Sequence, residues 1–164
     1  MQEVLLSKVV VNMGVGAEPD EMKKATQIIQ LVTGKKPAQR LCVARIPDWG
    51  LRPGVPIGLV VTLRGNDAVE FLKKALVAKA NKLPAKSFDR TGNFGFGVRE
   101  YIDLPGAKYD PKLGIKGFDV LVSLKKKGYR VKIRKIKQSK VGIKQRVTTA
   151  EAIDFARSLG VEVE

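Results

Sequence analysis

Three glycines within six residues are the feature that most restricts how this chain can fold. Gly92, Gly95 and Gly97 lie in the stretch 85–100, and a glycine inside a helix costs about 0.5–1 kcal/mol relative to alanine. The stretch is therefore predicted to be a loop that leads into a strand. It also contains three of the six phenylalanines together with several basic and amide side chains. This composition favours an ordered loop that faces a phosphate-rich partner.

The charge balance also indicates an anionic partner. The 164 residues include 31 Lys plus Arg against 16 Asp plus Glu, a formal charge of +15, and a surplus of this size repels itself in a compact state. Eleven of the cations and none of the acids fall within residues 121–147. Nucleic acid is the favoured partner, and a basic membrane-surface protein is the competing class. No apolar run approaches the roughly 20 residues of a bilayer span, and the opening Met1-Gln2-Glu3 is unlike a secretory signal, so a cytoplasmic location is expected.

The chain contains no histidine and a single cysteine, Cys42. This composition removes Ser-His and Cys-His nucleophiles and the common zinc sites, and it favours Cys42 as a small buried apolar residue. The remaining catalytic alternative is a magnesium-dependent RNA-processing enzyme that uses Asp103, Asp110 or Asp119, although their spacing is not diagnostic of a paired-metal site. A general RNA chaperone is a further alternative. We expect a protein that is not an enzyme and that uses no metal, no cofactor and no small-molecule substrate.

Hydrophobic periodicity and turn residues predict a mixed order of strands and helices. The predicted strands are 4–12, 40–46, 57–63, 98–104, 118–124 and 129–134, and the predicted helices are 19–33, a helix capped by Asn66, and 148–160 with the capping-box spacing of Thr148 and Glu151. This order predicts an α+β fold with a mainly antiparallel sheet, helices packed on one face and the split β-α-β topology of ferredoxin-like and RNA-recognition domains. We expect one domain over residues 1–164, with a basic hairpin and extension at 121–147 and a C-terminal helix at 148–160.

The turn after the first strand, Gly14-Val15-Gly16, resembles the start of a dinucleotide-binding unit. However, Pro19 replaces the third glycine, and Glu18, Asp20 and Glu21 would repel a pyrophosphate at the start of the helix. A plain strand-to-helix turn is the favoured interpretation.

Within the basic extension, apolar and basic side chains alternate over residues 129–134. A returning strand would therefore present Arg130, Lys132 and Arg134 on one face. A solvated edge strand protected by lysine is one interpretation. A surface that tracks phosphates is the favoured one.

The segment 45–55 contains prolines and glycines and the only tryptophan, Trp49. Proline and glycine at this density predict a loop, and we expect it to project from the fold. Trp49 either forms an exposed contact surface at its tip or folds back onto the core, and the sequence gives the two arrangements equal weight.

Three motifs occur in order along nearly the whole chain: Asn12-Met13-Gly14-Val15-Gly16; Pro56-Ile57-Gly58 with Val61-Thr62-Leu63-Arg64-Gly65; and Lys86-Ser87-Phe88-Asp89 with Gly92-Asn93-Phe94 and Gly97-Val98-Arg99-Glu100. Together they closely resemble a large-subunit ribosomal protein family called L five, which holds 5S rRNA in the central protuberance. The basic hairpin and the segment 139–156 resemble the archaeal form.

The resemblance implies an α+β fold that binds 5S rRNA, bridges it to the large-subunit rRNA and lies near a protein of the L eighteen family. It implies that the residues facing 5S rRNA are Asn12, Met13, Gly14, Thr62, Arg64, Ser87, Phe88, Gly92 and Asn93. The loop with Arg45, Trp49 and Arg52 corresponds to a projecting loop of the family that approaches P-site tRNA.

The residue types suggest a role for each group. Arg64, Lys86 and Arg90 are expected to neutralise phosphates, and Thr62, Ser87 and Asn93 are short donors suited to backbone oxygens and 2′-hydroxyls. Glycines at 14, 92 and 97 are expected to let the backbone approach a crowded sugar-phosphate surface. Phe88 either stacks on a base or fills the core beneath the loop, and the core is favoured.

Overall fold

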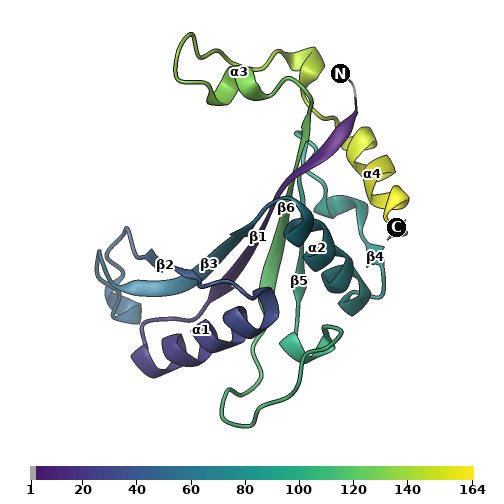
Figure 1. Ribbon diagram of the computed structural model, residues 1–164. Helices are drawn as coiled ribbons and strands as arrows, with labels where there is room; N and C mark the ends of the chain where they lie inside the picture. Colours follow the sequence, from purple (N-terminus) through teal and green to yellow (C-terminus); the bar gives the residue numbers. More distant parts are fainter. Residues whose placement is uncertain (1–2) are drawn as a thin grey trace. The chain divides into compact units, whose positions relative to one another are not determined.

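The computed structural model describes residues 3–164, and its main feature is a five-stranded antiparallel sheet (Figure 1). The strand order is β2-β3-β1-β6-β5. The strands are β1 (Val4–Gly14), β2 (Ala38–Leu41), β3 (Pro56–Leu63), β5 (Phe94–Val98) and β6 (Phe118–Lys126). A separate two-stranded parallel sheet joins β4 (Lys82–Leu83) to β7 (Glu162–Val163).

The helices are α1 (Pro19–Thr33), α2 (Asn66–Ala78), α3 (Arg130–Ile133) and α4 (Thr149–Ser158). Short 3-10 turns lie at Pro47–Trp49, Ala85–Ser87, Tyr101–Asp103 and Ile143–Gln145. No helix among residues 3–164 has the length and apolar character that crossing a bilayer requires.

The predicted fold class, α+β with a mainly antiparallel sheet, is confirmed. The order β2-β3-β1-β6 is that of the split β-α-β topology, with β6 as its fourth strand and β5 added outside it. The first helix also forms as predicted. Pro19 occupies its first turn, and Gly34 ends it in the left-handed region, donating its N–H to the Gln30 carbonyl at 2.8 Å.

The chain forms two compact units, and three of the strands contribute residues to both. Of the described residues, the first unit comprises 3–9, 64–96 and 121–164, and the second comprises 10–63 and 97–120. The prediction of one domain over the whole chain stays a prediction.

Each unit buries the apolar face of its own elements. In the first unit the largest fully buried side chains are Leu72 and Leu76 of α2, Leu83 of β4 and Val9 of β1. In the second unit they include Met13, Ile28, Ile29, Leu59 and Tyr101. Along β3, Leu59, Val61 and Leu63 are buried whereas Thr62 is exposed. This alternation is the period of two that leaves one face of a strand open.

Several predicted elements are wrong. The predicted strand 98–104 ends at Val98, and Tyr101 lies buried in a 3-10 turn. The predicted strand 40–46 is shorter and earlier, at Ala38–Leu41. Asn66 is the first residue of α2 rather than its cap, which is Gly65 with φ of 65° and ψ of −140°.

The predicted basic hairpin is also wrong. Residues Arg130–Ile133 form the short helix α3, and β6 continues to Lys126. The reason is the strand order, because β6 already lies between β1 and β5 and so offers no free edge to a returning strand. Arg130, Lys132 and Arg134 therefore do not share the face of a strand.

Gly92 has a packing role that its neighbours in sequence do not reveal. Its φ is +75°, and a Cβ at this position would lie 2.5 Å from Cγ1 and 2.7 Å from Cβ of Val147. Gly14 differs, because a Cβ there would meet nothing within 4 Å and its φ lies outside the left-handed region. Gly92 is therefore required by the fold, whereas Gly14 is not.

Replacing Gly92 by alanine is expected to lower the free energy of unfolding by about 1–3 kcal/mol, because the new methyl group overlaps Val147 and the backbone is left-handed. The matched variant Gly14→Ala is expected to change it by less than about 0.5 kcal/mol. Urea denaturation of the two variants beside the wild type measures both values. Equal stability of Gly92→Ala and Gly14→Ala would contradict the packing argument.

Candidate nucleic-acid interface

A groove rich in cations crosses the first unit. One cavity of about 890 Å³ lies between the ends of β1 and β6 and the start of the extension. Seven of its lining residues are Lys or Arg and none is Asp or Glu; they are Lys8, Arg64, Lys125, Lys126, Lys127, Arg130 and Lys132. A cavity with cations alone on its wall attracts a polyanion.

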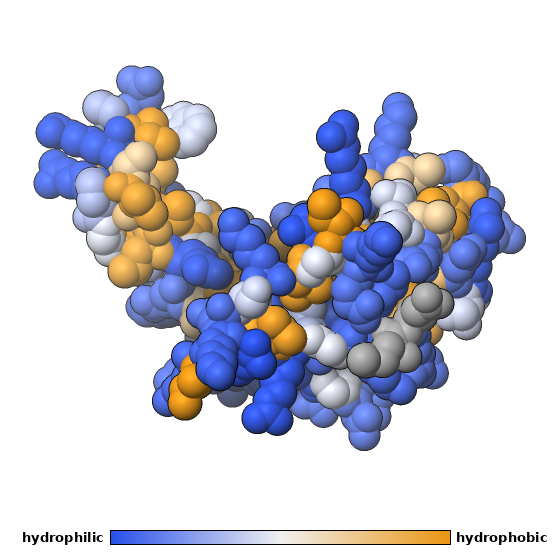
Figure 2. Space-filling model, turned by 90° about the horizontal axis from the view of Figure 1, so that it is seen from above, coloured by the Kyte–Doolittle hydropathy of each residue, from blue (hydrophilic) through white to orange (hydrophobic). Residues whose placement is uncertain are grey.

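A second cavity of about 670 Å³ continues this surface. It shares Asn93, Tyr129, Lys132, Gln138 and residues 124–126 with the first. It adds Lys140 and Arg146 and likewise has no acidic lining residue. We call the two cavities together the basic groove. Figure 2 shows the molecule from above, with hydrophilic side chains over most of the surface in view and smaller hydrophobic groups between them.

A short turn, residues 89–93, forms one wall of the basic groove. The Asp89 carboxylate accepts hydrogen bonds from the Arg90 N–H and the Thr91 hydroxyl, each at 2.6 Å. The Asn93 amide donates to the Thr91 hydroxyl at 2.9 Å. These bonds, the Thr91 bond first, hold the pKa of Asp89 below its ordinary value. The turn is thus fixed by its own side chains.

The turn rests on a buried aromatic pair. The rings of Phe88 and Phe94 lie 5.1 Å apart between centroids, and both residues are buried. The predicted preference of Phe88 for the core is therefore confirmed.

Side-chain to backbone bonds give the basic extension, residues 127–147, a defined path. The Gln145 amide donates to the Lys127 carbonyl at 2.8 Å, and the Ser139 N–H donates to the Val131 carbonyl at 3.1 Å. Arg134 Nε donates to the Lys137 carbonyl at 2.7 Å.

An ion pair joins the two segments that flank the basic extension. Lys126 is 6% exposed, and its Nζ lies 2.7 Å from Glu151 Oε1. Glu151 also forms the predicted capping box with Thr148 at the start of α4. The hydrogen bond from Lys126 and then that from the Thr148 N–H hold the pKa of Glu151 below its ordinary value. The end of β6 and the start of α4 are thus linked across the extension.

The structure brings four predicted site residues of the first unit into the basic groove, namely Arg64, Asn93, Arg130 and Lys132. Lys86 and Arg90 are exposed outside it. Phe88 and Gly92 are buried, so the expected approach of the Gly92 backbone to a sugar-phosphate surface is replaced by its packing on Val147. Ser87 is half-buried in the 3-10 turn before them.

In the second unit the predicted residues divide by the face of the strand. Asn12 is half-buried and Gly14 and Thr62 are exposed, all on the side opposite the buried Val11 and Val61. Met13 is 1% exposed, so its side chain belongs to the core and not to a contact surface.

The proline-rich loop of the second unit is an ordered hairpin. The backbone N–H groups of Ile46 and Leu51 each donate to the other residue's carbonyl, at 3.1 and 3.0 Å. Trp49 at its tip is 73% exposed. Of the two arrangements left open for Trp49, the exposed one is therefore observed, and Arg45 and Arg52 are exposed beside it in sequence. Cys42, at the base, is buried as predicted.

Sequence reasoning missed Lys8, Ser123 and Gln138 as lining residues of the basic groove. Lys8 and Ser123 could have been found, since Ser123 lies between two buried residues of β6 and Lys8 comes directly before the buried Val9 of β1. Gln138 had no such signal, because it lies in the irregular part of the extension.

The acidic residues considered for catalysis are not gathered into a site. Asp110 accepts the Lys112 N–H at 3.0 Å and so caps its own turn, while Asp103 and Asp119 are exposed. Within residues 3–164, no group of three His, Cys, Asp or Glu side chains could hold a metal ion.

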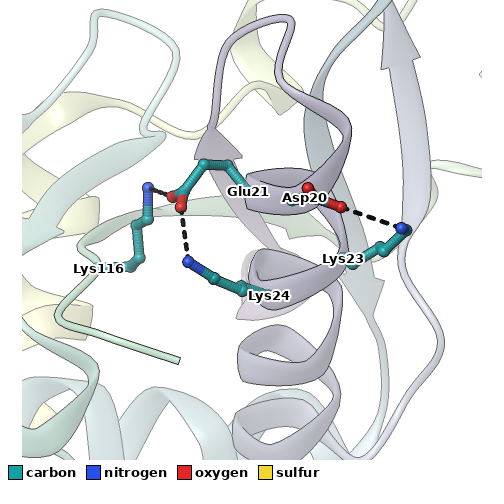
Figure 3. Close-up of polar contacts among 5 residues, drawn as sticks. All are labelled: Asp20, Glu21, Lys23, Lys24 and Lys116. Carbon is teal, nitrogen blue, oxygen red and sulfur yellow. Dashed lines mark hydrogen bonds and ion pairs between the residues drawn. The ribbon is translucent and has the colours of Figure 1, made fainter. Parts of the chain in front are cut away.

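The acidic start of α1 is engaged in ion pairs (Figure 3). Glu21 pairs with Lys116 and, at 3.0 Å, with Lys24, while Asp20 pairs with Lys23 at 3.0 Å. The bond from Lys116 is the first cause that holds the pKa of Glu21 below its ordinary value. These contacts support the interpretation of this segment as a plain strand-to-helix turn.

Comparison with known proteins gives matches over the whole chain. Residues 1–52 match the family described as Ribosomal protein L5, and residues 56–155 match the ribosomal L5P family C-terminus. The chain is 48% identical to the large ribosomal subunit protein uL5 of Pyrobaculum aerophilum over 100% of its own length and 92% of that protein. It is 48% identical to uL5 of Archaeoglobus fulgidus with the same coverage, and 42% identical to uL5 of Nitrosopumilus maritimus over 99% of its length and 95% of that protein.

The Lys126–Glu151 pair generates a prediction about stability. Glu151→Gln leaves a buried ammonium group without its counter-ion and is expected to lower the free energy of unfolding at pH 7 by about 1–3 kcal/mol. Because the folded state lowers the pKa of Glu151, its contribution is present above the ordinary value of 4.5 and is lost as the pH falls through the folded value. The deficit of the variant should therefore shrink below pH 4.5.

Urea denaturation at several pH values measures this deficit. Glu3→Gln is the matched control, since its partner Lys127 is exposed, and little change is expected. A deficit in Glu151→Gln that persists unchanged at low pH would contradict the role of the ion pair.

Proposed function

The chain belongs to the ribosomal protein L5 family, in its archaeal type, and on this premise we propose that it binds 5S rRNA in the central protuberance of the large ribosomal subunit. In this role it connects 5S rRNA to the large-subunit rRNA. Its neighbours there include a protein of the L eighteen family, and its location is the cytoplasmic ribosome.

The observation that carries this proposal is the basic groove. The side chains of Lys8, Arg64, Lys125 and Arg130 line it and make no ion pair or hydrogen bond with the described part of the chain. Cations that have no internal partner are available to neutralise phosphates, and phosphate contacts supply most of the affinity of proteins for nucleic acids.

The open face of the second unit gives further support. Asn12 and Thr62 present short polar side chains, and Gly14 leaves space above its backbone. RNA helices are recognised by shape through phosphates and 2′-hydroxyls, which such groups can bind. We therefore propose that Asn12, Gly14 and Thr62 contact 5S rRNA, with Ser87 and Asn93 in the first unit, and that Lys86, Arg90, Lys132 and Arg134 add charge.

We propose that the loop with Arg45, Trp49 and Arg52 contacts P-site tRNA. Its hairpin bonds fix the turn at whose tip Trp49 is 73% exposed. An exposed indole ring beside two arginines suits stacking on a base or ribose.

The proposed role is structural and not catalytic. No observation favours the magnesium-dependent enzyme, because the described aspartates form no group for a metal. A general RNA chaperone would bind RNA of any shape. Competition between 5S rRNA and an unrelated duplex of equal length separates that alternative from the proposed function, since only the latter requires 5S rRNA to bind more tightly.

The proposal predicts a steep dependence of affinity on salt. With about 6–10 phosphate contacts, the affinity for 5S rRNA should fall roughly 10³- to 10⁵-fold between 50 and 200 mM salt. Arg64→Gln should reduce the slope of log affinity against log salt by about one. Lys23→Gln, whose partner is Asp20 on α1, should leave the slope unchanged. Filter binding measures all three proteins, and a flat salt response would contradict the proposal.

Trp49→Ala is expected to weaken P-site tRNA binding about 5- to 100-fold, since stacking of one base contributes about 1–3 kcal/mol. Trp49→Phe keeps a flat ring and should retain most of the affinity. Tritiated or fluorescent tRNA binding to large subunits reconstituted with each variant measures the effect. The denaturation midpoint should not change, because the ring is 73% exposed, and unchanged tRNA affinity in Trp49→Ala would refute the contact.

A further inference from the structure

Two side-chain amides in the basic groove are oriented in the same way. Asn93 and Gln138 line both of its cavities. The amide nitrogen of Asn93 donates to the Thr91 hydroxyl at 2.9 Å, and that of Gln138 donates to the Lys132 carbonyl. Neither amide oxygen accepts a hydrogen bond from the described residues. Each amide is thus fixed through its nitrogen and offers its oxygen as an acceptor.

The surroundings of these amides combine apolar, aromatic and cationic groups. Leu124, Val147 and the half-buried Tyr129 contribute apolar and aromatic surface to the lining of the same groove. Lys132 Nζ lies 5.3 Å from the centre of the Tyr129 ring and donates to its hydroxyl at 3.0 Å. The Lys125 side chain adds a cation that has no partner among residues 3–164. A nucleotide fits such a lining. Its flat base can lie on the apolar and aromatic surface, its polar base edge can bind the amides, and its phosphate can pair with the lysines.

The size and form of the groove select an unpaired nucleotide. Cavities of about 670 and 890 Å³ fall within the range of small-ligand sites, about 300–1,000 Å³. The bases of an RNA duplex are stacked inside the helix, so a base that enters such a cavity must be unpaired.

We propose that the basic groove binds an unpaired nucleotide of RNA and that the amide oxygens of Asn93 and Gln138 accept hydrogen bonds from the exocyclic amino group of its base. Lys125 and Lys132 hold the adjoining phosphates. This inference rests on the proposed RNA-binding function and adds the strandedness and the base chemistry of the ligand. An acidic peptide fits less well, because its carboxylates are acceptors and would face the two amide oxygens.

The test uses the full chain and short hairpin RNAs that share one stem. Their loops carry adenosine or cytidine, or the analogues of each that lack the amino group, and a fully paired duplex of the same length is included. The wild type should bind the amino-bearing loops about tenfold more tightly than the analogue loops and more tightly than the duplex. An amide oxygen that the bound base covers and leaves without a donor accounts for the difference.

Gln138→Met keeps the length of the side chain but removes the acceptor, and it should reduce the tenfold preference to less than threefold. Gln27→Met, at an exposed position of α1, is the matched control and should keep it. Asn93→Ala is a second variant, and circular dichroism confirms that each protein is folded. A preference that persists in both Gln138→Met and Asn93→Ala would overturn the inference.

Four other outcomes are decisive. Equal affinity of the wild type for the duplex and the loops would overturn the inference. It would also be overturned if a polyglutamate peptide of matched charge displaced a bound hairpin as well as an unlabelled hairpin does. If the wild type binds 5S rRNA but shows no amino-group preference, the inference fails while the proposed function stands. If it does not bind 5S rRNA, the proposed function fails as well.

Discussion

The ion pair between Lys126 and Glu151 is the contact on which the basic surface of the first unit depends. It joins the last residue of β6 to the first turn of α4, and so it fixes both ends of the segment between them. That segment carries nine of the cations and no acid, and its self-repulsion favours an expanded chain. Because its ends are held together, five of these cations line the basic groove, namely Lys127, Arg130, Lys132, Lys140 and Arg146.

The few acids of the first unit near this groove support the same arrangement. Glu3 pairs with Lys127 and Glu151 with Lys126, while the Asp89 carboxylate is used within its own turn. None of these three lines the groove. The acids therefore stabilise the walls and leave the side chains of Lys8, Arg64, Lys125 and Arg130 without a partner among the described residues, which is the state in which they can bind phosphates.

Local patterns predicted those parts of the fold that local physics determines. Alternating apolar residues gave β1 and β3, Pro19 and Gly34 bounded α1, and the spacing of Thr148 and Glu151 gave the capping box. The alternation over 129–134 was misleading, because whether such a segment pairs depends on a free sheet edge, and β1 and β5 occupy both edges of β6. Gln138 enters the groove through its bond to Lys132, which no periodicity predicts. Long-range packing decides such features, so a single sequence does not reveal them.

The motifs that suggested the family show why a motif alone does not define an interface. Within one motif, Met13 points into the core while Asn12 and Gly14 remain accessible. A Cβ at Gly92 would overlap Val147, which follows it by 55 positions in the sequence, whereas a Cβ at Gly14 would meet nothing within 4 Å. Burial thus distinguishes two kinds of motif residue: buried ones that support the surface, and exposed ones that can contact RNA. Since the buried members are irreplaceable for stability and the exposed ones are not, loss of RNA binding without loss of stability is the property that identifies a true contact residue.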